Sequence, residues 1–167
     1  MKGKNIMITG ASFGIGRTIA TLLATQGVKL ILYSRRENRL KELQVQLDTP
    51  SYLLVFDVGN RKTVFEKINS LQEAYSSIDI LINNAGNTHG LNTVHKADLK
   101  NLDAIIDINV KGLIYVTKAV LPTMVSRKTG HIINISSIGE KEVYPTEVYT
   151  VVVNLRWMPL PKDYVWI

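Results

Sequence analysis

Short apolar segments alternate with segments of helical periodicity along most of the chain, and this alternation constrains the fold more than any other feature. Apolar runs cover residues 5–9, 28–33, 52–56, 78–82 and 131–135. Between them, apolar residues recur at helical spacing, as at positions 15, 19, 22 and 23 and at positions 64, 68, 71 and 75. A long helical stretch covers residues 99–125, with Gly112 interrupting it. This pattern predicts an α/β fold with a doubly wound parallel sheet that is covered on both faces.

The composition is that of one ordinary globular domain. The chain has 167 residues, of which 46% are hydrophobic and 20% are charged. It contains no cysteine, which excludes disulfides and cysteine metal sites. Its apolar runs are too short to cross a bilayer, and the run after Lys2 and Lys4 is typical of a first strand rather than a signal peptide. The composition therefore indicates a cytoplasmic protein without a membrane segment.

Positive charge is concentrated in the N-terminal part of the chain. The formal net charge is +6, and residues 1–41 hold eight Lys or Arg side chains but one acidic side chain, Glu37. Such a surface suits a nucleic acid, but the sequence has no motif that combines aromatic and basic residues for that purpose. A bound polyanionic cofactor explains the distribution better. The three histidines, at positions 89, 95 and 131, lack metal-ligand spacing, so no metal site is expected.

A glycine-rich turn joins the first predicted strand to the first predicted helix. It reads Thr-Gly-Ala-Ser-Phe-Gly-Ile-Gly over residues 9–16. Glycines permit a tight turn and a close approach of the backbone to a diphosphate, and the helix N-terminus offers free N–H groups and a positive dipole end. The place of the turn between strand and helix favours a dinucleotide-binding site over a purely structural turn. The expected binding residues are Gly10, Ser12, Phe13, Gly14, Ile15 and Gly16.

Four motifs then occur in the order found in one enzyme family. They are Gly-x-x-x-Gly-x-Gly at positions 10–16, Asn-Asn-Ala-Gly at 83–86, Ile-Asn-Val-Lys-Gly at 108–112, and a strand with its serine at 130–137. Together they resemble the short-chain dehydrogenase/reductase family over residues 5–149. The resemblance implies a Rossmann-type sheet with strand order 3-2-1-4-5 that lacks the family's last strands and substrate lid. It also implies homo-oligomers built from paired long helices, to which residues 99–125 would contribute.

The end of the second strand indicates which nicotinamide cofactor is used. An acid that binds the ribose of NAD is expected about 20 residues after the glycine motif, but residues 33–36 read Tyr-Ser-Arg-Arg. A guanidinium fork suits the 2′-phosphate of NADP, so Arg35 and Arg36 predict NADP. The alternative is that these arginines are only exposed residues at the start of a helix. The resemblance further implies an adenine contact from Asp57 and Val58 and a lining of the adenosine ribose from Asn84, Ala85 and Gly86. A helix N-cap is the other interpretation of Asp57.

Hydride transfer at a carbinol carbon needs a group that exchanges the hydroxyl proton. In the resembled family a tyrosine does this, a lysine four residues later lowers the tyrosine's pKa, a serine holds the substrate oxygen and an asparagine carries a water-linked proton relay. Asn109, Ser137 and Tyr149 fit the asparagine, serine and tyrosine; Tyr144, the rival tyrosine, lies closer to Ser137 and precedes a proline. Val153 stands where the lysine is expected. Because a tyrosine with a pKa of about 10 needs a neighbouring positive charge, we expect impaired activity.

Residues 151–167 do not fit the rest of the chain. Helical periodicity is lost after Thr150, and Pro159 and Pro161 fall where the family has a long helix. A reading frame that begins at the third base of the Val151 codon permits a lysine four places after Tyr149, followed by a helix-forming continuation. We therefore expect a dinucleotide-binding domain over residues 1–150 and an aberrant tail that follows a frameshift. A genuine divergent tail is the alternative.

The sequence thus predicts an NADP-dependent oxidoreductase that transfers a hydride between nicotinamide and a small hydroxy or carbonyl substrate. Residues 76–137 resemble a bacterial subgroup that acts on 3-hydroxy acids such as serine; a general carbonyl reductase is the other interpretation. The alternative function is a nucleotide-binding module without catalysis that acts in regulation or partner binding. The expected partner is a small-molecule substrate, with no nucleic acid and no membrane.

Overall fold

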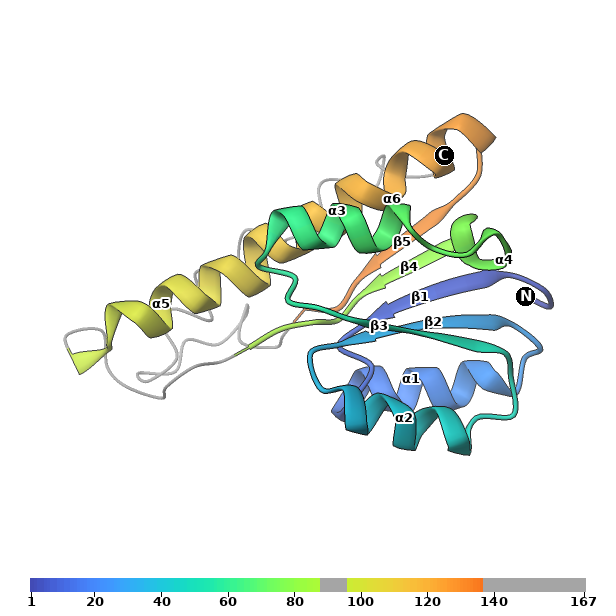
Figure 1. The fold of residues 1–167 in the computed structure, drawn as a ribbon, viewed down its shortest axis with the longest axis horizontal. Coiled ribbons are helices and arrows are strands. Elements are labelled where there is room, and N and C mark those ends of the chain that lie inside the picture. Colours follow the sequence, from blue (N-terminus) through green and yellow to red (C-terminus); the bar gives the residue numbers. More distant parts are fainter. Residues whose placement is uncertain (88–95, 137–167) are drawn as a thin grey trace.

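A computed structural model describes residues 1–87 and 96–136 of the chain. Five parallel strands form one sheet in the order β3-β2-β1-β4-β5, which confirms the predicted order (Figure 1). The strands are β1 (Asn5–Thr9), β2 (Lys29–Ser34), β3 (Ser51–Val55), β4 (Ile80–Asn83) and β5 (His131–Asn134). At the centre of the sheet, Met7 of β1 pairs with Ile31 on one side and Leu81 on the other.

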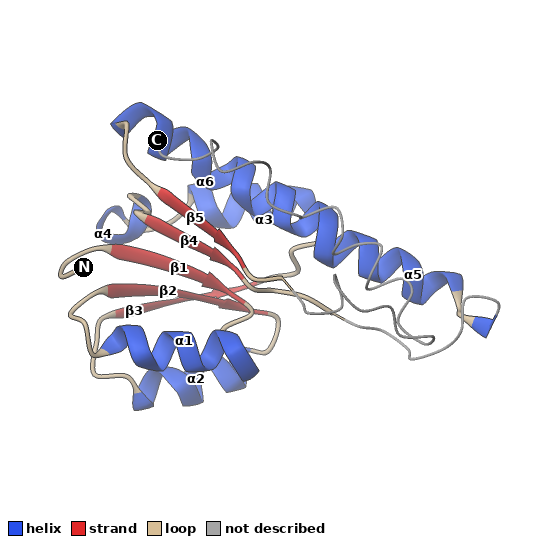
Figure 2. Ribbon diagram, turned by 180° about the vertical axis from the view of Figure 1, so that it is seen from behind, coloured by secondary structure: helices blue, strands red, loops and turns tan. Residues whose placement is uncertain are grey.

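Helices cover both faces of the sheet. They are α1 (Gly14–Ala24), α2 (Glu37–Gln46), α3 (Arg61–Asn69), α4 (Glu73–Ser76), α5 (Leu99–Ile106), the π-helical turn η2 (Asp107–Gly112) and α6 (Leu113–Arg127). Helices α1 and α2 lie against one face, and α3 and α6 lie against the other (Figures 1 and 2). Within the described residues, no helix combines the length and the apolar character that a membrane crossing needs.

The continuous apolar run of β1 follows from this two-sided cover. Successive side chains of a strand point to opposite faces, so Ile6 and Ile8 belong to the core under α1 and α2, whereas Met7 belongs to the core under α3 and α6. All three side chains are fully buried. Burial of each such side chain contributes about 1.5–3 kcal/mol, so a polar residue at any of them would oppose the fold.

The long predicted helix is present, but its irregularity differs from the expectation. The helical path continues from α5 through η2 into α6, so Gly112 does not break it. Gly112 instead ends the widened π-helical turn and packs against the loop after β3. A Cβ atom built on Gly112 would lie 2.7 Å from Val58 Cγ2, which only glycine avoids.

The helix predicted around positions 64–75 is divided into α3 and α4. The apolar face is as predicted, because Val64, Ile68 and Leu71 are buried in one core and Tyr75 packs against it. Helix α3 nevertheless ends at Asn69, and the separate turn α4 brings the Tyr75 ring to 5.4 Å from that of Tyr52.

A charged cluster, here called the amino-edge cluster, fastens β4 to β1 and α6 at the end of the sheet opposite the glycine turn. Asp79 accepts hydrogen bonds from the Asn5 N–H at 3.0 Å, Lys4 Nζ at 3.2 Å and Arg127 Nη1 at 3.1 Å. Burial alone would raise the pKa of Asp79, but these hydrogen bonds outweigh it and hold the pKa below its ordinary value.

Candidate functional site

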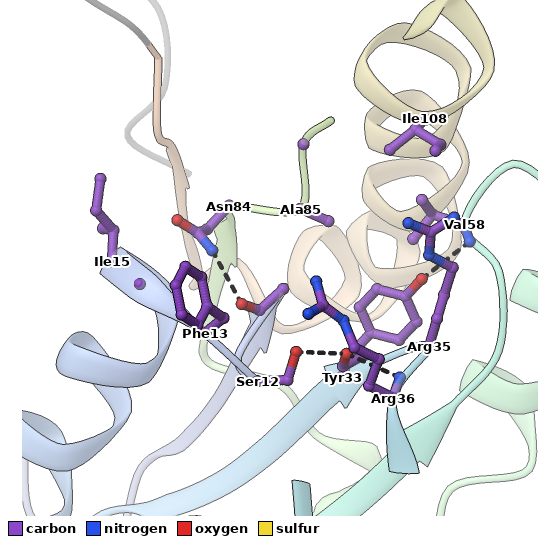
Figure 3. A pocket seen from close by; sticks show the side chains of 14 residues that line it. Ser12, Phe13, Ile15, Tyr33, Arg35, Arg36, Val58, Asn84, Ala85 and Ile108 are labelled. Atoms are coloured by element: carbon purple, nitrogen blue, oxygen red, sulfur yellow. Dashed lines mark hydrogen bonds between the residues drawn. The ribbon is translucent and has the colours of Figure 1, made fainter. Parts of the chain in front are cut away.

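A cavity of about 390 Å³ opens at the carboxyl ends of the strands, where ligands bind in doubly wound sheets. Its walls come from the segments that follow β1, β2, β3 and β4, together with one residue of η2 (Figure 3). The lining residues are Gly10, Ser12, Phe13, Gly14, Ile15, Tyr33, Ser34, Arg35, Arg36, Val58, Asn84, Ala85, Gly86 and Ile108.

The glycine turn brings the start of α1 onto the edge of the sheet. Gly10 has φ +70°, a conformation that favours glycine. Gly16 is buried against Gly10, and a Cβ atom on Gly16 would lie 2.5 Å from Gly10 O. Phe13 occupies the N-cap position of α1 in extended conformation and makes no side-chain capping hydrogen bond. The first N–H groups of α1 and its positive dipole end are thereby left to face a ligand in the cavity.

Hydrogen bonds tie the glycine turn to the loop after β4. Thr9 Oγ1 accepts from the backbone N–H groups of Asn84 and Ala85, each at 2.9 Å. In the opposite direction, Asn84 Nδ2 donates to Thr9 O at 3.0 Å and to Gly10 O at 3.3 Å. Two walls of the cavity are therefore held at a fixed separation by the protein itself.

A second set of hydrogen bonds holds the backbone at the end of β2, where Arg35 and Arg36 follow. Ser34 Oγ donates to Ser12 Oγ of the glycine turn at 2.7 Å and accepts from the Arg36 backbone N–H at 3.1 Å (Figure 3). Both serines are buried, whereas Arg35 and Arg36 are exposed. Arg35 Nη1 lies 3.9 Å from Asp57 Oδ2. The rim between β1 and β2 thus presents two guanidinium groups beside the N-terminus of α1.

Tyr33 forms the floor of the cavity beneath the loop after β3. Its hydroxyl donates to Phe56 O and accepts from the Val58 N–H, each at 3.0 Å, and its ring lies 4.3 Å from that of Phe56. Burial is the main cause that raises the pKa of Tyr33 far above its ordinary value, so this hydroxyl stays protonated. Tyr33 therefore shapes the wall at Val58 and does not act as an acid or base.

Large apolar side chains stand at the mouth of the cavity although they are exposed. Phe13 is 68% exposed and Ile15 61% exposed, and the Arg39 guanidinium carbon lies 5.6 Å above the Phe13 ring. Exposed apolar groups at the rim of a cavity are typical of a binding surface.

The structure brings most of the sequence-predicted binding residues together. Eleven of them line the cavity; Gly16 lies just behind the turn, and Asp57 faces a neighbouring cavity. Asp57 does not cap α3, so that interpretation is wrong: Asn60 Oδ1 accepts from the Thr63 N–H at 3.1 Å, and Asp57 Oδ1 accepts from the Gly59 N–H at 2.9 Å.

The predicted catalytic residues are only partly within the described chain. Asn109 lies on η2, and its side-chain amide both accepts from the Asn87 N–H at 2.8 Å and donates to Asn87 O at 2.9 Å. It therefore holds the end of the loop that lines the cavity. Ser137 and Tyr149, like Tyr144, Val153 and the tail after Thr150, lie outside the described residues.

Three lining residues, Tyr33, Ser34 and Ile108, were not among the predicted binding residues. The place of Tyr33 and Ser34 at the end of a strand was a usable signal, and so was the place of Ile108 at the start of the Ile-Asn-Val-Lys-Gly motif. Within residues 1–87 and 96–136, no group of three or more His, Asp or Glu side chains is arranged to hold a metal ion.

Comparison with known proteins identifies the family. A profile described as short chain dehydrogenase matches residues 4–150. The chain is 45% identical over 132 residues to the NADP-dependent 3-hydroxy acid dehydrogenase of Escherichia coli K12, an alignment that covers 79% of this chain and 53% of that protein. The chain thus spans about half the length of the curated relatives it matches.

Solved structures agree with this assignment. The crystal structure of serine dehydrogenase from Escherichia coli superimposes with a TM-score of 0.86 and 40% identity, covering 90% of this chain and 70% of that one. The closed form of serine dehydrogenase complexed with NADP⁺ has the same TM-score and identity and is covered to 61%. On the motifs, the fold and these matches, the chain belongs to the short-chain dehydrogenase family.

Proposed function

We propose that this chain binds NADP in the cavity at the carboxyl edge of the sheet, as part of an oxidoreductase that acts on a small hydroxy or carbonyl compound. One observation carries the proposal. The uncapped N-terminus of α1 and the arginine pair after β2 border the same cavity, and no acid stands at the end of β2 to bind a ribose without a phosphate.

The residues present fit the parts of such a cofactor. The turn between Gly10 and Gly16 offers backbone N–H groups to the diphosphate, and Arg35 and Arg36 offer guanidinium groups to the 2′-phosphate. Asp57 and Val58 would contact the adenine, and residues 84–86 would line the adenosine ribose. When bound, the nicotinamide of NADP gives or takes the hydride.

The proton side of the reaction is assigned to three residues. We place Tyr149 at the proton-exchanging position, Ser137 at the substrate oxygen and Asn109 at a water-linked relay. The side-chain amide of Asn109 is already hydrogen-bonded to the Asn87 backbone. Asn109 would therefore contribute to a relay through its own backbone and by holding the loop in place. A 3-hydroxy acid is the substrate class that the relatives favour, since they are described as 3-hydroxy acid and serine dehydrogenases.

A second candidate function rests on Val153. This residue stands four places after Tyr149, where a positive charge is needed to bring a tyrosine pKa towards neutrality. A chain with this valine fits a nucleotide-binding module that lacks efficient turnover. We also propose that residues 151–167 are the product of a frameshift after Thr150, which sequencing of the coding DNA tests directly.

Titration with NADPH and NADH, followed by calorimetry, tests cofactor binding. In an Arg35→Gln/Arg36→Gln variant we expect NADPH affinity to fall at least tenfold with NADH affinity nearly unchanged, since a hydrogen bond to a charged group contributes about 1.5–3 kcal/mol. Lys67→Gln/Lys128→Gln, an equal loss of two positive charges at the far ends of α3 and α6, is the matched control and should leave both affinities unchanged. Equal losses for both nucleotides in the arginine variant would contradict the proposal.

Turnover measured beside binding separates the two candidate functions. NADPH formation from NADP⁺ and a panel of 3-hydroxy acids that includes serine is followed in the same preparation. Binding with turnover supports the oxidoreductase, whereas binding without turnover supports the nucleotide-binding module.

A further inference from the structure

A small cavity of about 10 Å³ lies behind the wall of the candidate cofactor cavity, where β1, β4, the loop after β3 and the start of α6 meet. Val58 and Ala85 line both cavities. The lining residues of the small cavity, most of them buried, are Thr9, Val58, Asn83, Ala85, Gly112, Leu113 and Val116. A buried cavity needs roughly 10–15 Å³ to hold one water molecule. This cavity therefore has room for a single molecule of that size.

Asn83, at the end of β4, presents a buried acceptor on one side of the small cavity. Its Nδ2 donates to Thr117 Oγ1 on α6 and to Asn134 Oδ1 on β5, each at 3.0 Å. Its Oδ1 has no hydrogen-bond partner among the described residues, although Asn83 is only 4% exposed. The oxygen and nitrogen of an amide diverge, and Nδ2 is directed towards β5, so Oδ1 faces the other neighbour of β4, which is β1. A buried acceptor without a partner is costly.

Thr9, at the end of β1, supplies a donor to the same cavity. Its Oγ1 accepts from the backbone N–H groups of Asn84 and Ala85, so the lone pairs of this oxygen are already in use. Its hydroxyl proton is directed to Ile82 O at 3.4 Å, which is longer than the roughly 2.7–2.8 Å that is typical of O–H···O hydrogen bonds. The proton is therefore available to a closer acceptor.

We propose that the small cavity binds one structural water molecule, which accepts a hydrogen bond from the Thr9 hydroxyl and donates one to Asn83 Oδ1. Two polar partners are enough to hold a buried water. The water joins the ends of β1 and β4, and because it lies against Val58 and Ala85 it supports the wall of the larger cavity from inside the protein. It is distinct from the water of the relay assigned to Asn109, which does not line this cavity. The site does not depend on cofactor binding.

A crystal structure of the full chain tests the site directly, and a water is expected within hydrogen-bond distance of both Asn83 Oδ1 and Thr9 Oγ1. In solution, magnetic relaxation dispersion of the water oxygen counts the long-lived internal waters. Asn83→Leu nearly keeps the shape of the side chain but removes the acceptor, so the count should fall by one. Thr117→Val is the matched control, because it removes a partner of Asn83 Nδ2 and leaves Oδ1 unchanged. Its count should equal that of the wild type.

Val116→Ile tests the site without changing either polar partner, and it serves if Asn83→Leu does not fold. The added methyl group should displace the water and leave Asn83 Oδ1 unpaired, so the count should fall by one and Tm should fall by a few degrees. In a dry cavity the same methyl group would fill a void and raise Tm. A raised Tm, a water count that is unchanged in both variants, or a wild-type crystal structure without a water between Thr9 and Asn83 would overturn the proposal.

Discussion

Replacement of Thr9 by valine removes one hydroxyl from the end of β1 and tests what holds the cavity together. Thr9 Oγ1 is the acceptor for the backbone N–H groups of Asn84 and Ala85. Thr9 is 2% exposed, and valine has nearly the same shape as threonine. The substitution therefore removes these two hydrogen bonds, and the weaker one that Thr9 Oγ1 donates to Ile82 O at 3.4 Å, without opening a void in the sheet.

The size of the effect follows from the two donors left behind. An unsatisfied buried donor costs about 1–3 kcal/mol, and the half-buried position of both N–H groups lets water recover a part, so we expect a loss of roughly 2–4 kcal/mol. For a domain of this size each kcal/mol lowers Tm by about 2–4 °C. The fall in Tm should thus lie between about 4 and 16 °C.

Urea unfolding followed by circular dichroism measures this loss, and Thr9→Ser is the matched control. Serine keeps the hydroxyl and loses one methyl group, at a cost of about 1 kcal/mol. NADPH affinity should fall in the valine variant more than in the serine variant, since the loop after β4 lines the cavity. A valine variant as stable as the serine variant would refute the reasoning.

Two further substitutions test other parts of the structure. Gly16→Ala places a Cβ atom 2.5 Å from Gly10 O; overpacking of this kind costs about 1–3 kcal/mol, and NADPH binding should be lost in calorimetry. Gly14→Ala meets no atom within 4 Å, so only the strain of its positive φ of +53° opposes it, and it should lose less affinity. Asp79→Asn tests the amino-edge cluster. Burial raises the pKa of Asp79, but hydrogen bonds outweigh burial and depress it below 3.8, so the carboxylate stabilises the fold above that pH and the contribution is lost as pH falls through the folded-state pKa. Urea unfolding from pH 7 to pH 3 should show this loss in the wild type and a reduced pH dependence in the variant.

The strands and the carboxyl edge were predictable because their signals are local. Both faces of the sheet are covered, so the strands are unbroken apolar runs in the sequence, and the predicted limits differ from the observed ones by at most two residues. The glycine turn is local in part: Gly10 has a positive φ and Gly16 packs against Gly10 O, but both glycines also lie against Asn84 of the loop after β4.

The features that sequence reasoning missed depend on contacts between distant segments. The wide turn η2 has no periodic signature, and the need for Gly112 comes from Val58 on another loop. Likewise the hydroxyl of Tyr33 is defined by partners 23 and 25 residues away. The N-cap interpretation of Asp57 was wrong because the nearby Asn60 offers the same capping chemistry and is the residue that caps α3.

The ties between the glycine turn and the loop after β4 have a consequence for how a ligand arrives. Asn84 and Thr9 join the two segments through hydrogen bonds within the protein. A nucleotide that settles there meets donors that are already ordered, so little chain entropy is lost on association. Variants that keep these ties should therefore differ from the wild type mainly in how fast the nucleotide leaves.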